Sequence, residues 1–309
     1  MTTLLLSHQI CVRHEMPGSP ESPARLEAIE QALQSEQFSA LQREDCPEAR
    51  KDHIALAHGG DYIDEICDLT PESGYFAIDG DTTLCPHSYE AAMKAAGGAV
   101  RAVDAVMSGE VQNAFCAVRP PGHHATKHQA MGFCLFNNAA IAALHARKQH
   151  GAERLAVIDF DVHHGNGTQD IFWDEPDMFY GSTHQMPLYP GTGAVNETGA
   201  GNIVNTPLQS GADGAKLKEA FKDRLLPALH DFSPDLVVIS AGFDAHIDDP
   251  LAGLRLTTQD FRWLTLKLAE FADHHCDGRI VSLLEGGYDL RALGDCVATH
   301  VDVLLDAGL

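Results

Sequence analysis

The sequence has few basic residues and no long apolar segment. Lys and Arg together number 21 against 44 Asp and Glu, so the 309-residue chain carries a net charge of −23. A surface this acidic repels phosphate groups, and we therefore expect neither a nucleic-acid partner nor docking on an anionic membrane. No stretch is long and apolar enough to span a bilayer. The same charge attracts cationic small molecules and lysine-bearing peptides, although it also serves solubility.

Closely spaced cysteine pairs are absent too. The chain has eight cysteines, but no two are separated by just two residues, which excludes a zinc ribbon or a thioredoxin-type site. Their scatter indicates reduced, mostly buried thiols. Residues 1–6 have no basic start and too short an apolar run for a signal peptide, so we expect a cytoplasmic protein. Histidine, by contrast, is abundant at 18 residues, and it is the commonest metal ligand and acid–base residue.

Short apolar segments alternate with longer amphipathic ones along the chain. We expect strands at residues 114–118, 155–160, 178–182, 236–241 and 279–284. We expect helices at residues 23–37, 88–107, 138–149, 213–230, 257–274 and 291–306. Because the strands are apolar throughout, both of their faces should be buried, as in a parallel sheet covered by helices. The sequence therefore predicts a single doubly wound α/β domain over residues 1–309, with a mostly parallel central sheet flanked by helices.

Chemically active residues follow four of the predicted strands. The segments concerned are residues 119–125 (RPPGHHA), 161–167 (DVHHGNG), 242–246 (GFDAH) and 285–289 (EGGYD). Ligands of parallel α/β sheets collect at the carboxyl ends of the strands, which all lie at one edge. We therefore expect these four segments to meet in one functional site.

Three of the residues at this edge are candidate metal ligands. Strand alternation places Asp159, Asp161 and His163 on one side, and Asp161 and His163 are spaced to hold one ion. Asp244 follows Gly242, where the backbone can turn tightly, and is the third candidate. Two carboxylates and one imidazole leave a coordination position for water, as in a catalytic site. The set suits Zn²⁺ and also Fe²⁺, whereas the structural alternative is that these carboxylates cap helices.

The tandem histidines and a tyrosine are candidates for proton handling. Adjacent side chains in extended backbone point apart, so His123 and His124 suit two neighbouring positions better than one shared ion. Each needs a polar partner to fix its tautomer, and Asp159 and Asn166 are the candidates. Tyr288 either packs in the core or donates to a developing oxyanion.

These motifs resemble those of the histone deacetylase superfamily, in particular class II deacetylases and their bacterial homologues. The matching segments are residues 23–26 (PARL), 119–125 (RPPGHHA), 132–138 (GFCLFNN), 159–168 (DFDVHHGNGT), 240–246 (SAGFDAH), 249–253 (DPLAG) and 284–288 (LEGGY). They cover nearly the whole chain in family order. The resemblance implies the arginase–deacetylase fold and metal-dependent hydrolysis of an acetamide.

The resemblance also implies roles for individual residues. The metal ligands would be Asp161, His163 and Asp244, and the catalytic residues would be His123, His124 as general base and acid, and Tyr288. The substrate-binding residues would be Asp81, Gly132, Phe133, Tyr189, Leu251 and Gly287, with Arg25 lining an internal channel. One structural K⁺ would be held by Asp159, Asp161, His163, Ser182 and Thr183, and a second near Phe172, Glu175, Met178 and Asn202. Asp159 and Asn166 would be the polar partners of the tandem histidines.

Three functions remain open. The first is a zinc-dependent deacetylase that releases acetate from acetyl-lysine in a protein or peptide. The second is an acetylpolyamine amidohydrolase, although Leu251 stands where polyamine-selective relatives can carry an acidic residue. The third is a catalytically silent acyl-lysine-binding module, against which the complete set of ligands and catalytic residues argues. Asn166 in place of the Asp of class I enzymes supports class II character, and homo-oligomerisation is left open.

Overall fold

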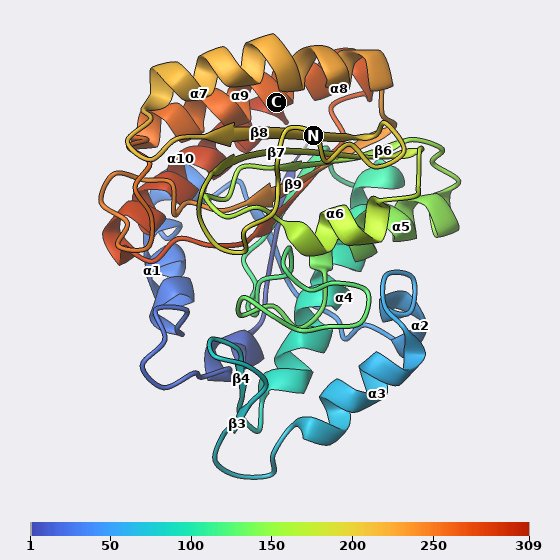
Figure 1. Ribbon diagram of the computed structural model, residues 1–309, viewed down its shortest axis with the longest axis vertical. Helices are drawn as coiled ribbons and strands as arrows, with labels where there is room; N and C mark the ends of the chain where they lie inside the picture. The colour runs from blue at the N-terminus through green and yellow to red at the C-terminus, as the bar shows by residue number, and fades with distance from the viewer. Residues whose placement is uncertain (1, 309) are drawn as a thin grey trace.

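An eight-stranded sheet forms the centre of the computed structural model, which describes residues 2–308 (Figure 1). The strands are β1 (Thr3–Ser7), β2 (Gln42–Asp45), β5 (Asn113–Cys116), β6 (Leu155–Asp159), β7 (Met178–Gln185), β8 (Ile203–Leu208), β9 (Leu236–Ala241) and β10 (Ile280–Leu284). Their order is β2-β1-β5-β10-β9-β6-β7-β8, and every neighbouring pair is parallel. Because all strands share one direction, their carboxyl ends lie at one edge.

Helices cover both faces of this sheet. One face carries α4 (Ser88–Met107), α5 (Asn138–His150) and the short α6 (Asn166–Phe172). The other carries α1 (Ala24–Ala32), α7 (Gly214–Ala220), α8 (Leu226–Phe232), α9 (Thr258–His275) and α10 (Leu290–Ala307), several of which form the upper layer in Figure 1. Shorter elements are α2 (Lys51–Ile54), α3 (Gly60–Leu69), the 3-10 turns Gln9–Arg13 and Glu36–Phe38, and the antiparallel pair β3 (Phe76–Ala77) and β4 (Thr83–Leu84). Within residues 2–308, no helix combines the length and apolar character that crossing a membrane requires.

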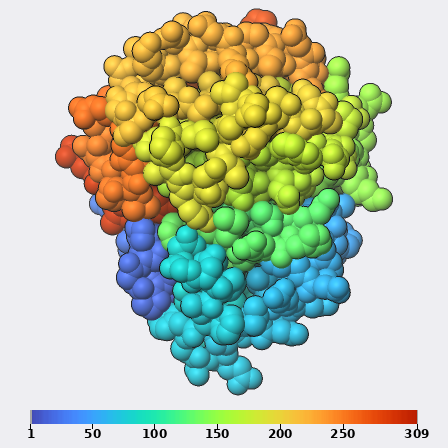
Figure 2. Space-filling view, in the orientation of Figure 1, coloured from blue at the N-terminus to red at the C-terminus, as the bar shows by residue number. Residues whose placement is uncertain are grey.

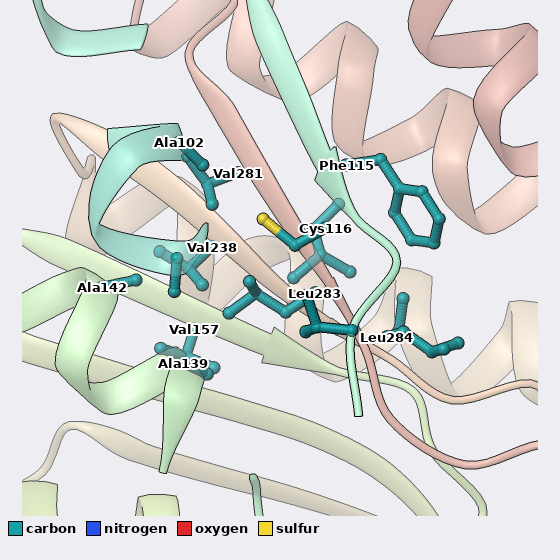
Figure 3. Packing of buried hydrophobic residues seen from close by; sticks show 14 of the residues in the cluster. Ala102, Phe115, Cys116, Ala139, Ala142, Val157, Val238, Val281, Leu283 and Leu284 are labelled. Atoms are coloured by element: carbon teal, nitrogen blue, oxygen red, sulfur yellow. The ribbon is translucent and has the colours of Figure 1, made fainter. Parts of the chain in front are cut away.

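The central strands are buried on both faces, as their apolar sequences predict. Successive residues of a strand point to opposite faces. Phe115 accordingly packs against His300 of α10, with ring centroids 5.5 Å apart, while Cys116 belongs to the cluster beneath α4 and α5 (Figure 3). On that side, Ala102 of α4 and Ala139 of α5 lie close to the strand side chains. Small helix residues let these helices approach the sheet closely, which fixes the strand ends.

The predicted fold class is confirmed, and most predicted elements are present. The strand at 236–241 and the helix at 88–107 have the predicted bounds. The helix predicted at 23–37 is wrong in length, because it ends at Ala32 and Ser35 is extended, which turns Phe38 into the core. The helix predicted at 213–230 contains a π-helical turn over Phe221–Leu225 before Pro227, whose missing N–H cannot continue the regular ladder.

Strands β1, β2 and β8 are not predicted by the sequence. Strand β2 has the sequence QRED and forms one edge of the sheet, where charged residues protect the unpaired backbone. Strand β8 forms the other edge and contains Pro207, a residue that an edge strand tolerates. Both edges therefore lack the continuous apolar pattern from which the central strands are recognised.

A fully buried charge cluster lies beneath the loop that follows β10. The Nη2 of Arg119 donates to Glu21 Oε2 at 2.6 Å, and Arg25 Nη1 donates to Glu21 Oε1 at 3.0 Å. Arg25 Nε also donates to the carbonyl oxygen of Gly287 at 2.7 Å. Although burial raises the pKa of Glu21, the two guanidinium groups outweigh this effect and lower it to about 2. The cluster thus ties the N-terminal segment to the loop that carries Tyr288.

We predict that Glu21→Gln lowers the free energy of unfolding by about 3–5 kcal/mol, because it leaves two guanidinium groups buried without a counter-charge. Since the folded-state pKa of Glu21 is depressed, its contribution is present above the ordinary glutamate pKa and is lost as the pH falls towards 2. Chemical denaturation of both proteins across this pH range measures the effect. The exposed Glu27→Gln on α1 is the matched control, and equal stability of Glu21→Gln and the parent would contradict the prediction.

Candidate active site

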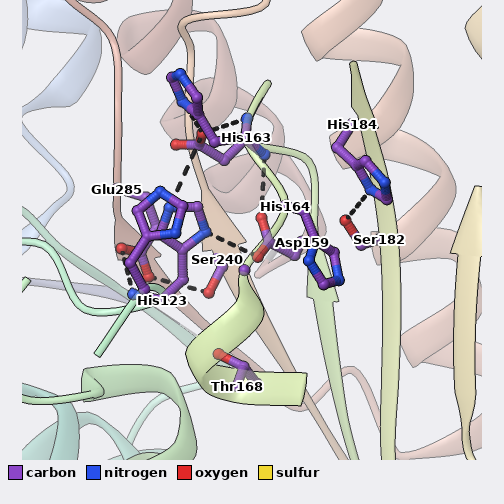
Figure 4. A network of polar contacts seen from close by, with 12 residues as sticks. His123, Asp159, His163, His164, Thr168, Ser182, His184, Ser240 and Glu285 are labelled. Atoms are coloured by element: carbon purple, nitrogen blue, oxygen red, sulfur yellow. Dashed lines mark hydrogen bonds and ion pairs between the residues drawn. The ribbon is translucent and has the colours of Figure 1, made fainter. Parts of the chain in front are cut away.

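The four segments singled out by the sequence meet at one edge of the sheet. Strands β5, β10, β9 and β6 are direct neighbours, and each segment follows the carboxyl end of one of them. Figure 4 shows His123, Asp159, His163 and Glu285 converging from these strands into one polar network. The order of neighbours in the sheet is what brings together residues more than a hundred positions apart in sequence.

The candidate metal ligands form a compact, buried triad. His163 Nδ1 lies 3.1 Å from both Asp161 Oδ1 and Asp244 Oδ2, and one donor atom from each residue lies within 4.8 Å of the others. The second oxygen of each carboxylate is held by backbone, Asp161 Oδ2 by the N–H of Gly286 and Asp244 Oδ1 by the N–H of Val162, each at 2.8 Å. The other carboxylate oxygens, Asp161 Oδ1 and Asp244 Oδ2, therefore face His163 Nδ1.

The charges of this triad fit a divalent cation. Burial lowers the pKa of His163, but its hydrogen bonds with Asp161 and Asp244 outweigh burial and raise it to about 10. Burial and the neighbouring Asp161 raise the pKa of Asp244 to about 7. The two buried carboxylates thus favour a positive charge beside them. The proton on His163 provides it here, and a metal ion with oxygen and nitrogen ligands would take the place of that proton. An alanine at Gly286 would place its Cβ against both carboxylates, so the close approach of this loop requires glycine.

The tandem histidines have different partners and different charges. His123 Nδ1 lies 2.9 Å from Asp159 Oδ2, and His124 Nδ1 lies 2.8 Å from Asn166 Oδ1. Burial lowers the pKa of His123, but the carboxylates around it, chiefly those of Asp159 and Asp161, outweigh burial and raise it well above the ordinary value. Burial, followed by the nearby His123 and His163, lowers the pKa of His124 well below the ordinary value. The pair therefore combines a cationic and a neutral imidazole.

Asp249 and Arg25 hold Tyr288 and the loop after β10 in place through three contacts. The backbone N–H of Tyr288 donates to Asp249 Oδ2 at 2.7 Å, and Arg25 binds the carbonyl of Gly287. The Arg25 guanidinium also lies 5.0 Å from the centroid of the Tyr288 ring. Burial raises the pKa of Tyr288 well above the ordinary value, so the phenol stays protonated and is available as a hydrogen-bond donor.

Aromatic side chains surround the approach to the triad. The Tyr189 ring packs edge-on against His124 with centroids 5.2 Å apart, and the Phe133 ring packs edge-on against Tyr288 at 6.1 Å. Phe133 has a positive φ of 67°, and the preceding Gly132 lies so close to the His124 ring that a Cβ there would overlap it. Asp81 Oδ1 accepts a hydrogen bond from the N–H of Gly132 at 3.1 Å.

The segments that carry these residues come from distant parts of the sequence. In Figure 2 the cyan, green and yellow surfaces adjoin on one face of the molecule, which places the regions around residues 80, 130 and 190 side by side. Tyr189 and Leu251 are partly exposed, at 39% and 36%. The structure thus brings most of the expected substrate-binding residues to the site, with Leu251 held through its N–H to Asp249 Oδ1 at 3.0 Å.

The residues expected to hold potassium lie in two places. Asp159 and Ser182 are paired on the neighbouring strands β6 and β7, with Asp161, His163 and Thr183 close in sequence. The second set is arranged differently. The carbonyl oxygens of Phe172, Glu175 and Met178 converge on the side-chain nitrogen Nδ2 of Asn202, at 2.9, 3.0 and 2.6 Å. The Asn202 amide thus occupies the point to which these carbonyls are directed, and a second potassium ion among these residues stays a prediction.

Comparison with known proteins identifies the family. The sequence matches the histone deacetylase domain over residues 19–304. The chain belongs to the histone deacetylase family. This histone deacetylase fold is also seen in the crystal structure of the HDA15 HD domain, which superposes with a TM-score of 0.93 at 36% sequence identity and covers 99% of this chain and 88% of that one.

Curated relatives of this deacetylase come from several kingdoms. The chloroplastic histone deacetylase 10 of Oryza sativa is 39% identical over 306 residues, covering 92% of this chain and 69% of the relative. The histone deacetylase-like amidohydrolase of Pseudomonas aeruginosa is 39% identical over 293 residues, covering 93% and 77%. The probable deacetylase of Archaeoglobus fulgidus is 38% identical over 299 residues, covering 94% and 82%. The protein is thus a deacetylase of this family.

Several residues of the deacetylase site were not assigned a role from the sequence. The hydroxyl of Tyr180 donates to Asp159 Oδ2 at 3.0 Å, so it shares that carboxylate with His123. Glu285 Oε2 accepts hydrogen bonds from the N–H groups of Gly122 and His123, and its Oε1 accepts one from Ser240. Glu285 lies in a recognised motif, but its partners lie on β9 and in the loop after β5, so only the fold reveals what it does.

We predict that Asn166→Asp raises the pKa of His124 by about 1 unit or more, because a carboxylate replaces a neutral amide at 2.8 Å. If His124 is the base, the acidic limb of the pH profile of kcat/KM on an acetyl-lysine peptide moves to higher pH. Asn196→Asp makes the same charge change on the exposed surface and should leave the limb in place. An active Asn166→Asp enzyme with an unmoved limb would show that another group titrates.

Proposed function

We propose that this deacetylase uses Zn²⁺ to remove acetyl groups from lysine side chains of proteins or peptides. The observation that carries the proposal is the buried triad of Asp161, His163 and Asp244, placed beside one cationic and one neutral imidazole. A silent binding module has no need of this costly arrangement of buried charge. Fe²⁺ has similar ligand preferences, and metal analysis of the active enzyme distinguishes the two.

Different residues of the chain carry out different parts of the reaction. When bound, the ion lowers the pKa of a water molecule and polarises the acetyl carbonyl. His124 binds Asn166 through Nδ1, so its Nε2 is free to accept the proton of the attacking water and later to give a proton to the leaving amine. His123, kept cationic beside Asp159, stabilises negative charge nearby. Tyr288 donates its phenolic proton in a hydrogen bond to the developing oxyanion.

We predict that Tyr288→Phe lowers kcat by roughly 10²–10³, because loss of one oxyanion donor costs about that factor. KM should change little, since Phe133 and Tyr189 make the contacts with the lysine stem. Steady-state acetate release from an acetyl-lysine peptide gives both constants, and metal content of the same preparation should be unchanged. Near-normal kcat in Tyr288→Phe would assign carbonyl polarisation to another group. If the metal-loaded parent enzyme releases no acetate, the proposed function itself is contradicted.

The substrate class follows from the rim of the site. Phe133 and Tyr189 offer two aromatic walls suited to the alkyl part of acetyl-lysine, and Leu251 presents a partly exposed apolar side chain. The distal ammonium of an acetylated polyamine would gain no charged partner from Leu251. We therefore favour acetyl-lysine over acetylpolyamines as substrate. The net charge of −23 argues weakly the other way, because a monoacetylated polyamine keeps its remaining ammonium groups whereas acetylation neutralises the lysine side chain.

We predict that Leu251→Glu shifts the ratio of kcat/KM towards monoacetylated spermidine by about 10-fold or more, because a charge-assisted contact adds about 1.5–3 kcal/mol. The measurement compares acetylspermidine with an acetyl-lysine peptide in the parent and the variant. Leu266→Glu, at an exposed position on α9, adds the same charge elsewhere and should leave the ratio unchanged. A parent enzyme that already prefers the polyamine strongly would show that Leu251 is not the discriminating residue.

Three further assignments belong to this proposal. The chain acts as one catalytic unit, because the loops at one edge of a single sheet carry the triad, the tandem histidines and Tyr288. A potassium ion binds at the first set around Asp159 and Ser182, where a carboxylate and a hydroxyl lie on paired strands. The protein works in a reducing compartment such as the cytoplasm, which its eight unpaired cysteines support.

A further inference from the structure

A second cluster of metal-ligating side chains lies towards the C-terminal end of α5, away from the active site. It consists of Asp104 on α4 together with His145 and His150 on α5. The helix starts at Asn138, whose amide donates to the carbonyl of Pro120 beside the active site. At 1.5 Å per residue, the start and end of this helix are about 18 Å apart. The cluster is therefore separate from the catalytic triad, and no step of deacetylation uses it.

The three side chains are already directed at one point. His145 Nε2 and His150 Nε2 each lie 2.8 Å from the same oxygen, Oδ1 of Asp104. A tetrahedral zinc ion with ligands at about 2.0–2.1 Å separates its ligand atoms by about 3.3 Å. The two N–O distances would open by about 0.5 Å around such an ion, and all three ligand atoms already lie within 4.8 Å of one another. In the metal-free state the Nε2–H of each imidazole donates to Asp104; when Nε2 binds an ion, the proton of each neutral ring is carried by Nδ1 instead.

The surroundings hold the ligands in position but leave one side open. His145 is 5% exposed and packs between two other imidazoles, with ring centroids 5.3 Å from His53 and 5.9 Å from His150. The side chains of Asp104 and His150 are 43% and 20% exposed, so water reaches the cluster. Burial raises the pKa of Asp104, but its hydrogen bonds from His145 and His150 outweigh burial and lower it, so the carboxylate is ionised and ready to ligate.

We propose that Asp104, His145 and His150 form a second, non-catalytic site for a divalent transition-metal ion of the zinc type, with water completing the coordination. A set of two imidazoles and one carboxylate favours binding of such ions over binding of Mg²⁺ or Ca²⁺. Because Asp104 lies on α4 and both histidines lie on α5, the ion cross-links the two helices that cover one face of the sheet. The site would stabilise the fold, and it does not rest on the function proposed for the triad.

Zinc binding to the full chain tests this site after the catalytic site is removed. Asp244→Ala eliminates one ligand of the triad and serves as the parent, to which ZnCl₂ is added in calorimetry and in thermal unfolding. We expect this parent to bind one zinc ion per chain and to melt at a higher temperature with zinc. Adding His150→Gln should weaken binding at least 10-fold and abolish the thermal shift, and adding Asp104→Asn should do the same.

Two controls keep the outcomes distinct. His150→Gln keeps a group that can donate to Asp104, and in the otherwise unaltered enzyme it should leave kcat unchanged, which shows that it folds. His275→Gln alters the exposed His230–His275 pair, whose nitrogens are 2.7 Å apart without a carboxylate, and should leave zinc binding intact. The proposal is overturned if the Asp244→Ala parent binds no zinc, if His150→Gln binds as tightly as that parent, or if only His275→Gln loses the ion.

Discussion

The burial of four carboxylates at one edge of the sheet is the constraint on which the active site depends. Asp159, Asp161, Asp244 and Glu285 all lie at the ends of neighbouring strands and are almost inaccessible to water. Isolated charges in such a place are prohibitively costly. Each is therefore held by backbone N–H groups, by imidazole or by hydroxyl groups, and the triad among them calls for a cation. Carboxylates this close together repel one another, which explains why each has several polar partners.

The positive charges behind the site serve the same balance. Arg25 and Arg119 are fully buried and share Glu21, so the three side chains together carry one net positive charge, and each guanidinium also binds backbone carbonyls. Through the carbonyls of Glu285 and Gly287, Arg25 fixes the loop from which Tyr288 reaches the site. A residue distant in the sequence therefore determines where the Tyr288 hydroxyl stands, and small displacements of a group at a reaction site cost much of its effect.

The sequence was informative where local pattern and tertiary role coincide. Four strands directly precede the segments that carry His123, Asp161, Asp244 and Tyr288. They are almost continuously apolar, so both the sheet and its functional edge could be predicted. Strand β2 and strand β8 carry charged residues and a proline because they are edges, and that pattern does not distinguish a strand from a loop. The roles of Glu285 and Tyr180 could not be predicted, since each is defined by partners on other strands.

Histidine shows how one residue type acquires different functions from its neighbours. His123 binds a carboxylate and is cationic, whereas His124 binds the amide of Asn166 and is neutral, although the two are adjacent in sequence. His300 is a core residue that packs among aromatic rings and lies between two hydroxyls, and its burial lowers its pKa to about 3. The count of histidines in the sequence signals chemistry, but only the group bonded to each ring nitrogen decides whether that chemistry is proton transfer, metal binding or packing.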